Sequence, residues 1–201
     1  MKNLKDYIIQ EGFLRKNLGL GKDVLIQKWL DEHKITDYMI NQDLTIDVDC
    51  SRKFAGCLDF QRSDIEEFPD YIQFGKIMGN MHCGRMEKLK SLRGFPKEIT
   101  GYFHIGLCNN LKNLVGGPKF VGDDFKCGGC KNLESLEGAP EEVIGDFNCV
   151  NCPKLKSLKG APKTVGGNFY CGRRRKPLFT VDDVKNNSNV SGHIDVSDYY
   201  I

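Results

Sequence analysis

SLEGAPEEVIGDFNC, residues 135–149, is followed by SLKGAPKTVGGNFYC, residues 157–171, in this 201-residue chain. The two stretches match at an offset of 22 residues. The same period extends without a gap over five segments, which begin at Gly79, Gly101, Asp123, Gly145 and Gly167. A 22-residue coil cannot bury its own apolar face, so successive coils must stack on one another. We therefore expect a short solenoid.

Apolar residues occupy fixed columns of this repeat. One column holds Met81, Phe103, Phe125, Phe147 and Phe169, and the next holds Cys83, Ile105, Cys127, Cys149 and Cys171. Two leucine columns follow at Leu89, Leu111, Leu133 and Leu155 and at Leu92, Leu114, Leu136 and Leu158. The run 143–149 alternates with period two, which predicts one strand per coil with Val143, Phe147 and Cys149 pointing inward. Strands of adjacent coils should form a parallel sheet.

The residues that do not repeat are interpreted as caps. In residues 1–43 we expect two short helices, the second one carrying Val24, Leu25, Trp29 and Leu30 behind Asp23 as N-cap. The alternative is a partner-binding arm with Trp29 as its anchor. Residues 44–50, LTIDVDC, alternate like a strand that leads into the first coil.

At the other end, Thr180-x-x-Asp183 resembles a capping box, so we expect a short helix near 181–187. Val190, Ile194 and Val196 predict a final strand that closes the exposed sheet edge. The expected fold class is a β-rich α+β solenoid of 22-residue coils with a parallel sheet. Its solenoid domain spans 44–177, between an N-terminal helical cap at 1–43 and a C-terminal helix–strand cap at 178–201.

The repeats resemble the leucine-rich-repeat family. Ala55-x-x-Leu58-x-Phe60-x-x-Ser63-x-Ile65-x-x-Phe68-Pro69 is nearest its consensus, whereas later coils have Phe-x-Cys in place of Leu-x-Leu. SLEGAPEEVIGDFNC and SLKGAPKTVGGNFYC look like a variant found in proteins of tailed bacteriophages and gut bacteria. Such repeats mostly serve as binding scaffolds, so the resemblance is specific for architecture and weak for activity.

Composition narrows the function classes. With 29 Lys+Arg against 27 Asp+Glu the net charge is +2, which argues against a globally basic nucleic-acid binder. No apolar run approaches the roughly 18 residues that cross a bilayer, and MKNLKDYIIQEG contains no signal-peptide core. We expect a cytoplasmic protein with mostly reduced cysteines, without membrane contact, cofactor or small-molecule substrate.

A zinc site is the tempting chemistry. Cys127-x-x-Cys130 and Cys149-x-x-Cys152 are separated by 18 residues, a spacing typical of four-cysteine zinc sites. In register, however, the motif is the 22-residue period seen twice, and the first cysteine column also holds Ile105, which cannot bind a metal. We expect stacked, reduced core cysteines, with zinc as the alternative.

Catalytic motifs find little support. His82 and His104 occupy equivalent repeat positions, so their pairing is explained by the period. A nucleophile pair of Cys83 with His104 conflicts with strand alternation, which turns Cys83 inward and His104 outward. We therefore expect a protein that is not an enzyme.

The remaining candidate site is the outward sheet face, the usual binding surface of a solenoid. One predicted ladder consists of His82, His104, Lys126, Asn148 and Tyr170, and a second one of Asn80, Tyr102, Asp124, Asp146 and Asn168. Their mixture of aromatic and polar side chains suits a protein interface. The alternative is a merely solvated face.

A basic cluster ends the last repeat at Arg173, Arg174, Arg175 and Lys176. It is interpreted either as a contact to RNA, DNA or an acidic protein surface, or as a solvated loop. Basic residues of the leucine segments could extend this zone: Lys88, Lys90, Arg93, Lys154, Lys156 and Lys159.

The resemblance to phage-type repeats implies a partner. It suggests a phage-encoded protein in the host cytoplasm that binds and inhibits a host defence factor, such as a CRISPR effector nuclease or its guide-RNA complex, by surface occlusion. The alternatives are a virion structural or assembly protein, or an RNA-binding protein that uses residues 173–176.

Overall fold

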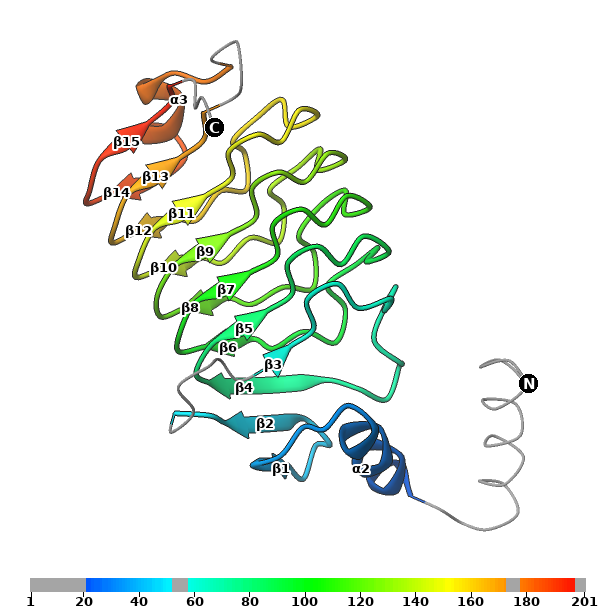
Figure 1. The fold of residues 1–201 in the computed structure, drawn as a ribbon. Helices are drawn as coiled ribbons and strands as arrows, with labels where there is room; N and C mark the ends of the chain where they lie inside the picture. Colours follow the sequence, from blue (N-terminus) through cyan, green and yellow to red (C-terminus); the bar gives the residue numbers. More distant parts are fainter. Residues whose placement is uncertain (1–20, 52–57, 173–177, 198–201) are drawn as a thin grey trace.

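The computed structural model describes residues 21–51, 58–172 and 178–197, and these residues form a stack of coils with two rows of short strands (Figure 1). Every coil contributes one strand to each of two sheets. Within the described residues, the first sheet, sheet A, has eight strands and the second, sheet B, has seven. All neighbouring strands are parallel except β1 and β2.

The strands are short because each coil turns twice within a few residues. Sheet A contains β1 (Tyr38–Ile40), β2 (Ile46–Asp49), β4 (Phe74–Met78), β6 (Glu98–Ile99), β8 (Phe120–Val121), β10 (Glu142–Val143), β12 (Thr164–Val165) and β14 (Asn189–Val190). Sheet B contains β3 (Leu58–Asp59), β5 (Met81–His82), β7 (Phe103–His104), β9 (Phe125–Lys126), β11 (Phe147–Asn148), β13 (Phe169–Tyr170) and β15 (Ile194–Asp195).

The expected solenoid with parallel strands is confirmed, but the single strand predicted over 143–149 is wrong. A corner at residues 144–146 divides it into β10 and β11, and these belong to different sheets. Gly145 makes the corner possible, because a Cβ atom there would lie 2.7 Å from the backbone of Asp123 in the preceding coil. Alternation survives across the corner, so Val143, Phe147 and Cys149 still point inward.

The core consists of the predicted columns. The rings of Phe103, Phe125, Phe147 and Phe169 stack along the solenoid axis, with successive centroids 5.5, 5.7 and 4.8 Å apart. Both leucine columns and the cysteine columns are buried around them. This one continuous core fixes the register of every strand and therefore the positions of the outward side chains.

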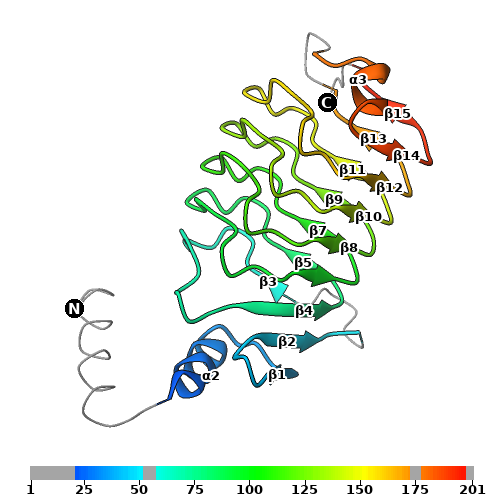
Figure 2. The ribbon, with the colours of Figure 1, turned by 180° about the vertical axis from the view of Figure 1, so that it is seen from behind.

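A helical cap covers the N-terminal end of the solenoid. Helix α2 (Lys22–Glu32) lies at that end in both views (Figures 1 and 2). Its N-cap is Gly21, and Asp23 lies in the first turn, so the prediction of Asp23 as N-cap is wrong. Trp29 is buried and its ring meets Phe68 edge-on at 5.5 Å, which excludes it as an exposed anchor. The first predicted helix falls outside the described residues.

The leading strand and the C-terminal cap agree with the sequence in outline. Strand β2 confirms the strand expected in residues 44–50, and β1, which the sequence did not predict, pairs with it antiparallel. Helix α3 (Val181–Lys185) carries the predicted capping box between Thr180 and Asp183. In place of one closing strand there are two, β14 and β15, so the C-terminal cap completes a further coil.

Candidate functional site

The outward face of sheet B carries the first predicted ladder. Strand pairing places seven outward residues side by side in successive coils: Asp59, His82, His104, Lys126, Asn148, Tyr170 and Asp195. With about 4.8 Å between strands, His82 and Tyr170 lie on the order of 19 Å apart. The structure therefore confirms the ladder as a row, but it separates Tyr170 from the histidines.

The second predicted ladder is mainly structural. The side-chain oxygen of Asp124 accepts a hydrogen bond of 2.9 Å from the backbone N–H of Asp146, and Asp146 accepts one of 2.6 Å from Asn168. Asn80 does the same for the N–H of Tyr102 at 3.0 Å. We call Asn80, Asp124, Asp146 and Asn168 the Asx ladder. Because these side chains accept hydrogen bonds from backbone N–H groups at the corners, they link neighbouring coils and are not free to bind a partner.

Tyr102 interrupts the Asx ladder. It occupies the ladder position in its coil, but a phenol ring has no acceptor close to the backbone and cannot bond the N–H of Asp124. Its ring instead meets His82 edge-on, with centroids 4.7 Å apart, and His82 meets His104 in the same way at 5.4 Å. We call His82, Tyr102 and His104 the Tyr102 cluster.

A second departure accompanies the first. The corner residue after each Asx is glycine, because a Cβ atom at Gly101, Gly145 or Gly167 would lie 2.0, 2.6 or 2.4 Å from the Asx oxygen of the preceding coil. The coil after Tyr102 has Asp123 at this position. Without an Asx oxygen beneath it, a side chain is tolerated there. In the other coils an Asx residue is followed one coil later by a corner glycine, which we call the Asx–Gly rule. Tyr102 and Asp123 depart from this rule together.

Two glycines make room for the ring of His104. A Cβ atom at Gly84 would lie 3.0 Å from Cε1 of His104, and one at Gly106 would lie 2.8 Å from its Nε2. Partial burial, with smaller contributions from His82, Lys126 and Arg85, lowers the pKa of His104 below its ordinary value of 6.5. The imidazole is therefore neutral near pH 7. The Nδ1 atom of His82 is buried and has no hydrogen-bond partner among the described residues.

Charged groups lie on both sides of the Tyr102 cluster. Lys126 forms an ion pair of 2.8 Å with Asp124. Burial opposes ionisation of Asp124, but the hydrogen bonds from Lys126 and from the Asp146 N–H outweigh it and lower the pKa of Asp124. Burial, with a smaller contribution from the charge of Asp59, raises the pKa of Tyr102 above 10.0, so its hydroxyl stays protonated.

The cysteine columns are packing elements. Cys127 and Cys149 lie in one buried column, while Cys130 and Cys152 lie in the next one. Among residues 21–51, 58–172 and 178–197 no three His, Cys, Asp or Glu side chains form a metal-binding group. The thiol of Cys152 donates to the Cys127 carbonyl at 3.5 Å, and burial raises its pKa to about 11. The seven thiols of the columns are free, while Cys50 in the leading coil is disulfide-bonded.

The predicted basic zone divides into three parts. Arg173, Arg174, Arg175 and Lys176 lie outside the described residues. Three of these cations form ion pairs. Lys88 lies 3.1 Å from Asp64 and Lys90 lies 2.6 Å from Glu66, while Arg93 is paired with Glu67 and Asp70. Lys154, Lys156 and Lys159 are exposed on the leucine segments, on the coils farther from the N-terminal cap. The first leucine segments are therefore close to neutral.

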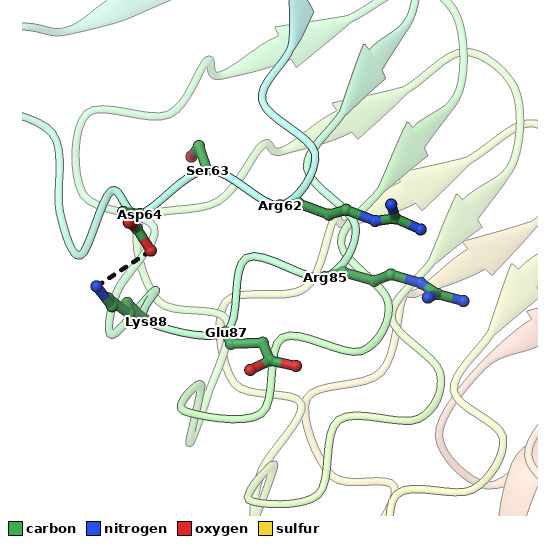
Figure 3. A pocket seen from close by; sticks show the side chains of 6 residues that line it. All are labelled: Arg62, Ser63, Asp64, Arg85, Glu87 and Lys88. Atoms are coloured by element: carbon green, nitrogen blue, oxygen red, sulfur yellow. Dashed lines mark ion pairs between the residues drawn. The ribbon is translucent and has the colours of Figure 1, made fainter.

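A pair of arginines that the sequence did not predict as a site lies beside the Tyr102 cluster. Arg62 and Arg85 follow β3 and β5 at equivalent positions, and both have positive φ angles, of 57° and 61°. They line a surface pocket of about 330 Å³ with Ser63, Asp64, Glu87 and Lys88. Their side chains project side by side in one direction, away from the Asp64–Lys88 pair (Figure 3). The signal was the column four residues after Leu58 and Met81, with Arg85 in the first aligned repeat and Arg62 in the coil before it.

The described helices include none that is both long enough and apolar enough to span a membrane. The parallel solenoid agrees with the repeat architecture that the sequence predicts. Comparisons with protein-family models, with curated proteins and with solved structures found no match to this chain.

Proposed function

We propose that this chain is a non-enzymatic protein-binding module whose partner docks on the outward face of sheet B, around the Tyr102 cluster. The observation that carries the proposal is the joint departure of Tyr102 and Asp123 from the Asx–Gly rule. Asn80, Asp124 and Asp146 each accept a hydrogen bond from the backbone N–H of the next coil. Tyr102 has no oxygen in that place, so its coil lacks this bond and loses the stability that it would add. Surface features that cost stability commonly serve binding.

The chemistry of the cluster suits a protein interface. Tyr102 and His104 are half-buried, so their rings are already partly ordered before a partner arrives. Preordered aromatic side chains lose little entropy on binding, and tyrosine is enriched at interface hot spots. The strands beneath them are fixed by the continuous core, which makes the face a rigid platform.

The resemblance to phage-type repeats suggests the kind of partner and the mode of action. We propose that the docked partner is a host defence factor, such as a CRISPR effector, and that binding occludes a surface which the factor needs. A purified effector should then lose activity in proportion to added protein, with complete inhibition near equimolar ratio. Inhibition by a small catalytic fraction of one equivalent would instead point to enzymatic modification and overturn this mechanism.

Partner binding is tested with immobilised full-length protein and the partner captured from the natural host. The variant Y102N/D123G gives this coil the residues that the other coils already use, so it removes the phenol ring while keeping the fold. We expect at least about a tenfold loss of affinity, equivalent to about 1.4 kcal/mol.

The matched control is F120T on the outward face of sheet A. Phe120 is half-buried there, and Thr164 already occupies its column two coils further on. This control should bind like the wild type. Equal loss in both variants, or none in Y102N/D123G, would contradict docking on sheet B.

A further inference from the structure

We infer that Arg62, Arg85 and Leu107 form a recognition stripe for an acidic protein segment, in which carboxylates meet the two arginines and an apolar residue meets Leu107. This inference rests on the proposed function, because it names the chemistry of the partner that docks beside the Tyr102 cluster.

The first observation is conformational. The three residues occupy one corner column and have φ angles of 57°, 61° and 63°, in the left-handed region that non-glycine residues rarely adopt. The same column holds Gly129 and Asn151 further along, which are the residue types suited to this region. Arg62, Arg85 and Leu107 therefore occupy corners that their backbone preferences oppose. Such departures cluster at binding sites.

The second observation concerns charge. Among the described residues neither Arg62 nor Arg85 forms an ion pair or a side-chain hydrogen bond, whereas the nearby Lys88 and Arg93 are both paired with acids. The guanidinium groups of Arg62 and Arg85 project in parallel from successive coils (Figure 3). Glu87 lines the same pocket, but no ion pair joins it to either arginine among the described residues. Two adjacent cations without an ion-pair partner present a geometry that carboxylates can bridge by charge-assisted hydrogen bonds.

The third observation concerns the apolar end of the stripe. Leu107 is 39% exposed, although it is a leucine on a polar surface. Its side chain lies over the next corner, since a Cβ atom at Gly129 would come within 2.6 Å of its Cδ2 atom. Glycine at that position leaves the leucine in place and accessible. An apolar side chain of the partner can pack against it.

The fourth observation separates a protein segment from a nucleic acid. A nucleic-acid backbone carries a negative charge at every nucleotide and needs a continuous basic track. Asp59 lies in the row of His82 on the face of sheet B, and Asp124 and Asp146 lie at the corners directly before β9 and β11. These acids interrupt the track. A short segment with two neighbouring carboxylates and one apolar residue needs only the two arginines and Leu107, and no continuous basic track.

The experiment uses fluorescence anisotropy of a fluorescein-labelled peptide, acetyl-GEDEDLLG-amide, with the full chain. A charge-neutral peptide in which both Glu residues are replaced by Lys, acetyl-GKDKDLLG-amide, and a single-stranded RNA of eight nucleotides are the comparison probes. The test variant is R62Q/R85Q. The control variant is K154Q/K159Q, which removes the same charge from exposed lysines of the leucine segments and controls for long-range electrostatics.

We expect the acidic peptide to bind the wild type more tightly than both comparison probes. We expect R62Q/R85Q to weaken binding about tenfold, K154Q/K159Q to weaken it less than about twofold, and L107S to weaken it about threefold. Equal weakening by both double variants, preference for the RNA, or no peptide binding at millimolar concentration overturns the inference. If the peptide fails while Y102N/D123G still loses the captured partner, the acidic stripe is wrong and docking on sheet B stands.

Discussion

The carboxylate of Asp124 accepts a hydrogen bond of 2.9 Å from the backbone N–H of Asp146, its equivalent in the next coil. The relationship repeats between Asp146 and Asn168 at 2.6 Å. A row of identical contacts between successive coils stabilises a solenoid as a sum of nearest-neighbour interfaces. The corner hydrogen bonds are therefore as much part of the fold as the apolar columns are.

Removing one member of the Asx ladder should destabilise the protein. We expect D146A to lower the free energy of unfolding by about 1–3 kcal/mol, because the part-buried backbone N–H of Asn168 loses its hydrogen-bond acceptor. D146N keeps an acceptor oxygen and should stay within about 0.5 kcal/mol of the wild type. Urea denaturation followed by circular dichroism measures both. A D146A midpoint equal to that of the wild type would show that water replaces the carboxylate.

Tyr102 and Asp123 should be coupled energetically. In Y102N the new amide oxygen meets the side chain of Asp123, so we expect no gain in stability or a small loss. In Y102N/D123G the corner matches those at Gly101 and Gly145, and we expect a coupling free energy of about 1 kcal/mol in favour of the double variant. A double-mutant cycle in urea gives this value. Strict additivity would mean that the two departures are independent.

The stability of the fold should depend on pH through His104. Burial lowers its pKa in the folded state, so the unfolded chain binds the proton more tightly. Stability is then complete above the ordinary pKa of 6.5 and falls as the pH drops from 6.5 through the lower folded pKa.

Two measurements check this pH dependence. The His104 imidazole resonances, followed by NMR, should titrate below pH 6.5. H104N should flatten the loss of thermal stability between about pH 7 and pH 5, the range in which an imidazole titrates. A His104 resonance that titrates above the ordinary value would reverse the sign of the effect and refute the prediction.

The column thiols should be unreactive in the folded protein. Burial raises the pKa of Cys108 to about 11 and that of Cys171 to about 12, so neither forms thiolate near neutral pH. We expect slow labelling by a disulfide reagent at pH 8 and rapid labelling of seven thiols after unfolding in urea under non-reducing conditions. Rapid labelling of these cysteines before unfolding would show that the coils open.

C108A tests the other role of these thiols. Cys108 donates to the Cys83 carbonyl at 3.1 Å, which links two coils. We expect C108A to cost about 1–3 kcal/mol in the free energy of unfolding, from a small cavity and a lost hydrogen bond. L107A, one residue away but exposed, is the matched control and should cost less than about 0.5 kcal/mol. Equal costs would remove the packing argument for the cysteine columns.

The sequence by itself determined the coil. Phe103, Phe125 and Phe147 recur every 22 residues, and a strict period of apolar residues has no other way to be buried than by stacking. The inward direction of Cys149 and the outward direction of Asn148 followed from alternation alone. The capping box at Thr180 and Asp183 was readable because its contacts are local.

Only the tertiary structure decided how each outward side chain is used. Asp124 and Tyr102 belong to the same column in the sequence, yet one is bound to the backbone of the next coil and the other packs on His82. Likewise, Arg62 and Lys88 carry the same charge, but only Lys88 forms an ion pair, with Asp64, among the described residues. The period of the sequence determines the column to which a residue belongs. Its interaction partner is determined by contacts between neighbouring coils, and these depend on three-dimensional distances that the sequence of one coil does not give.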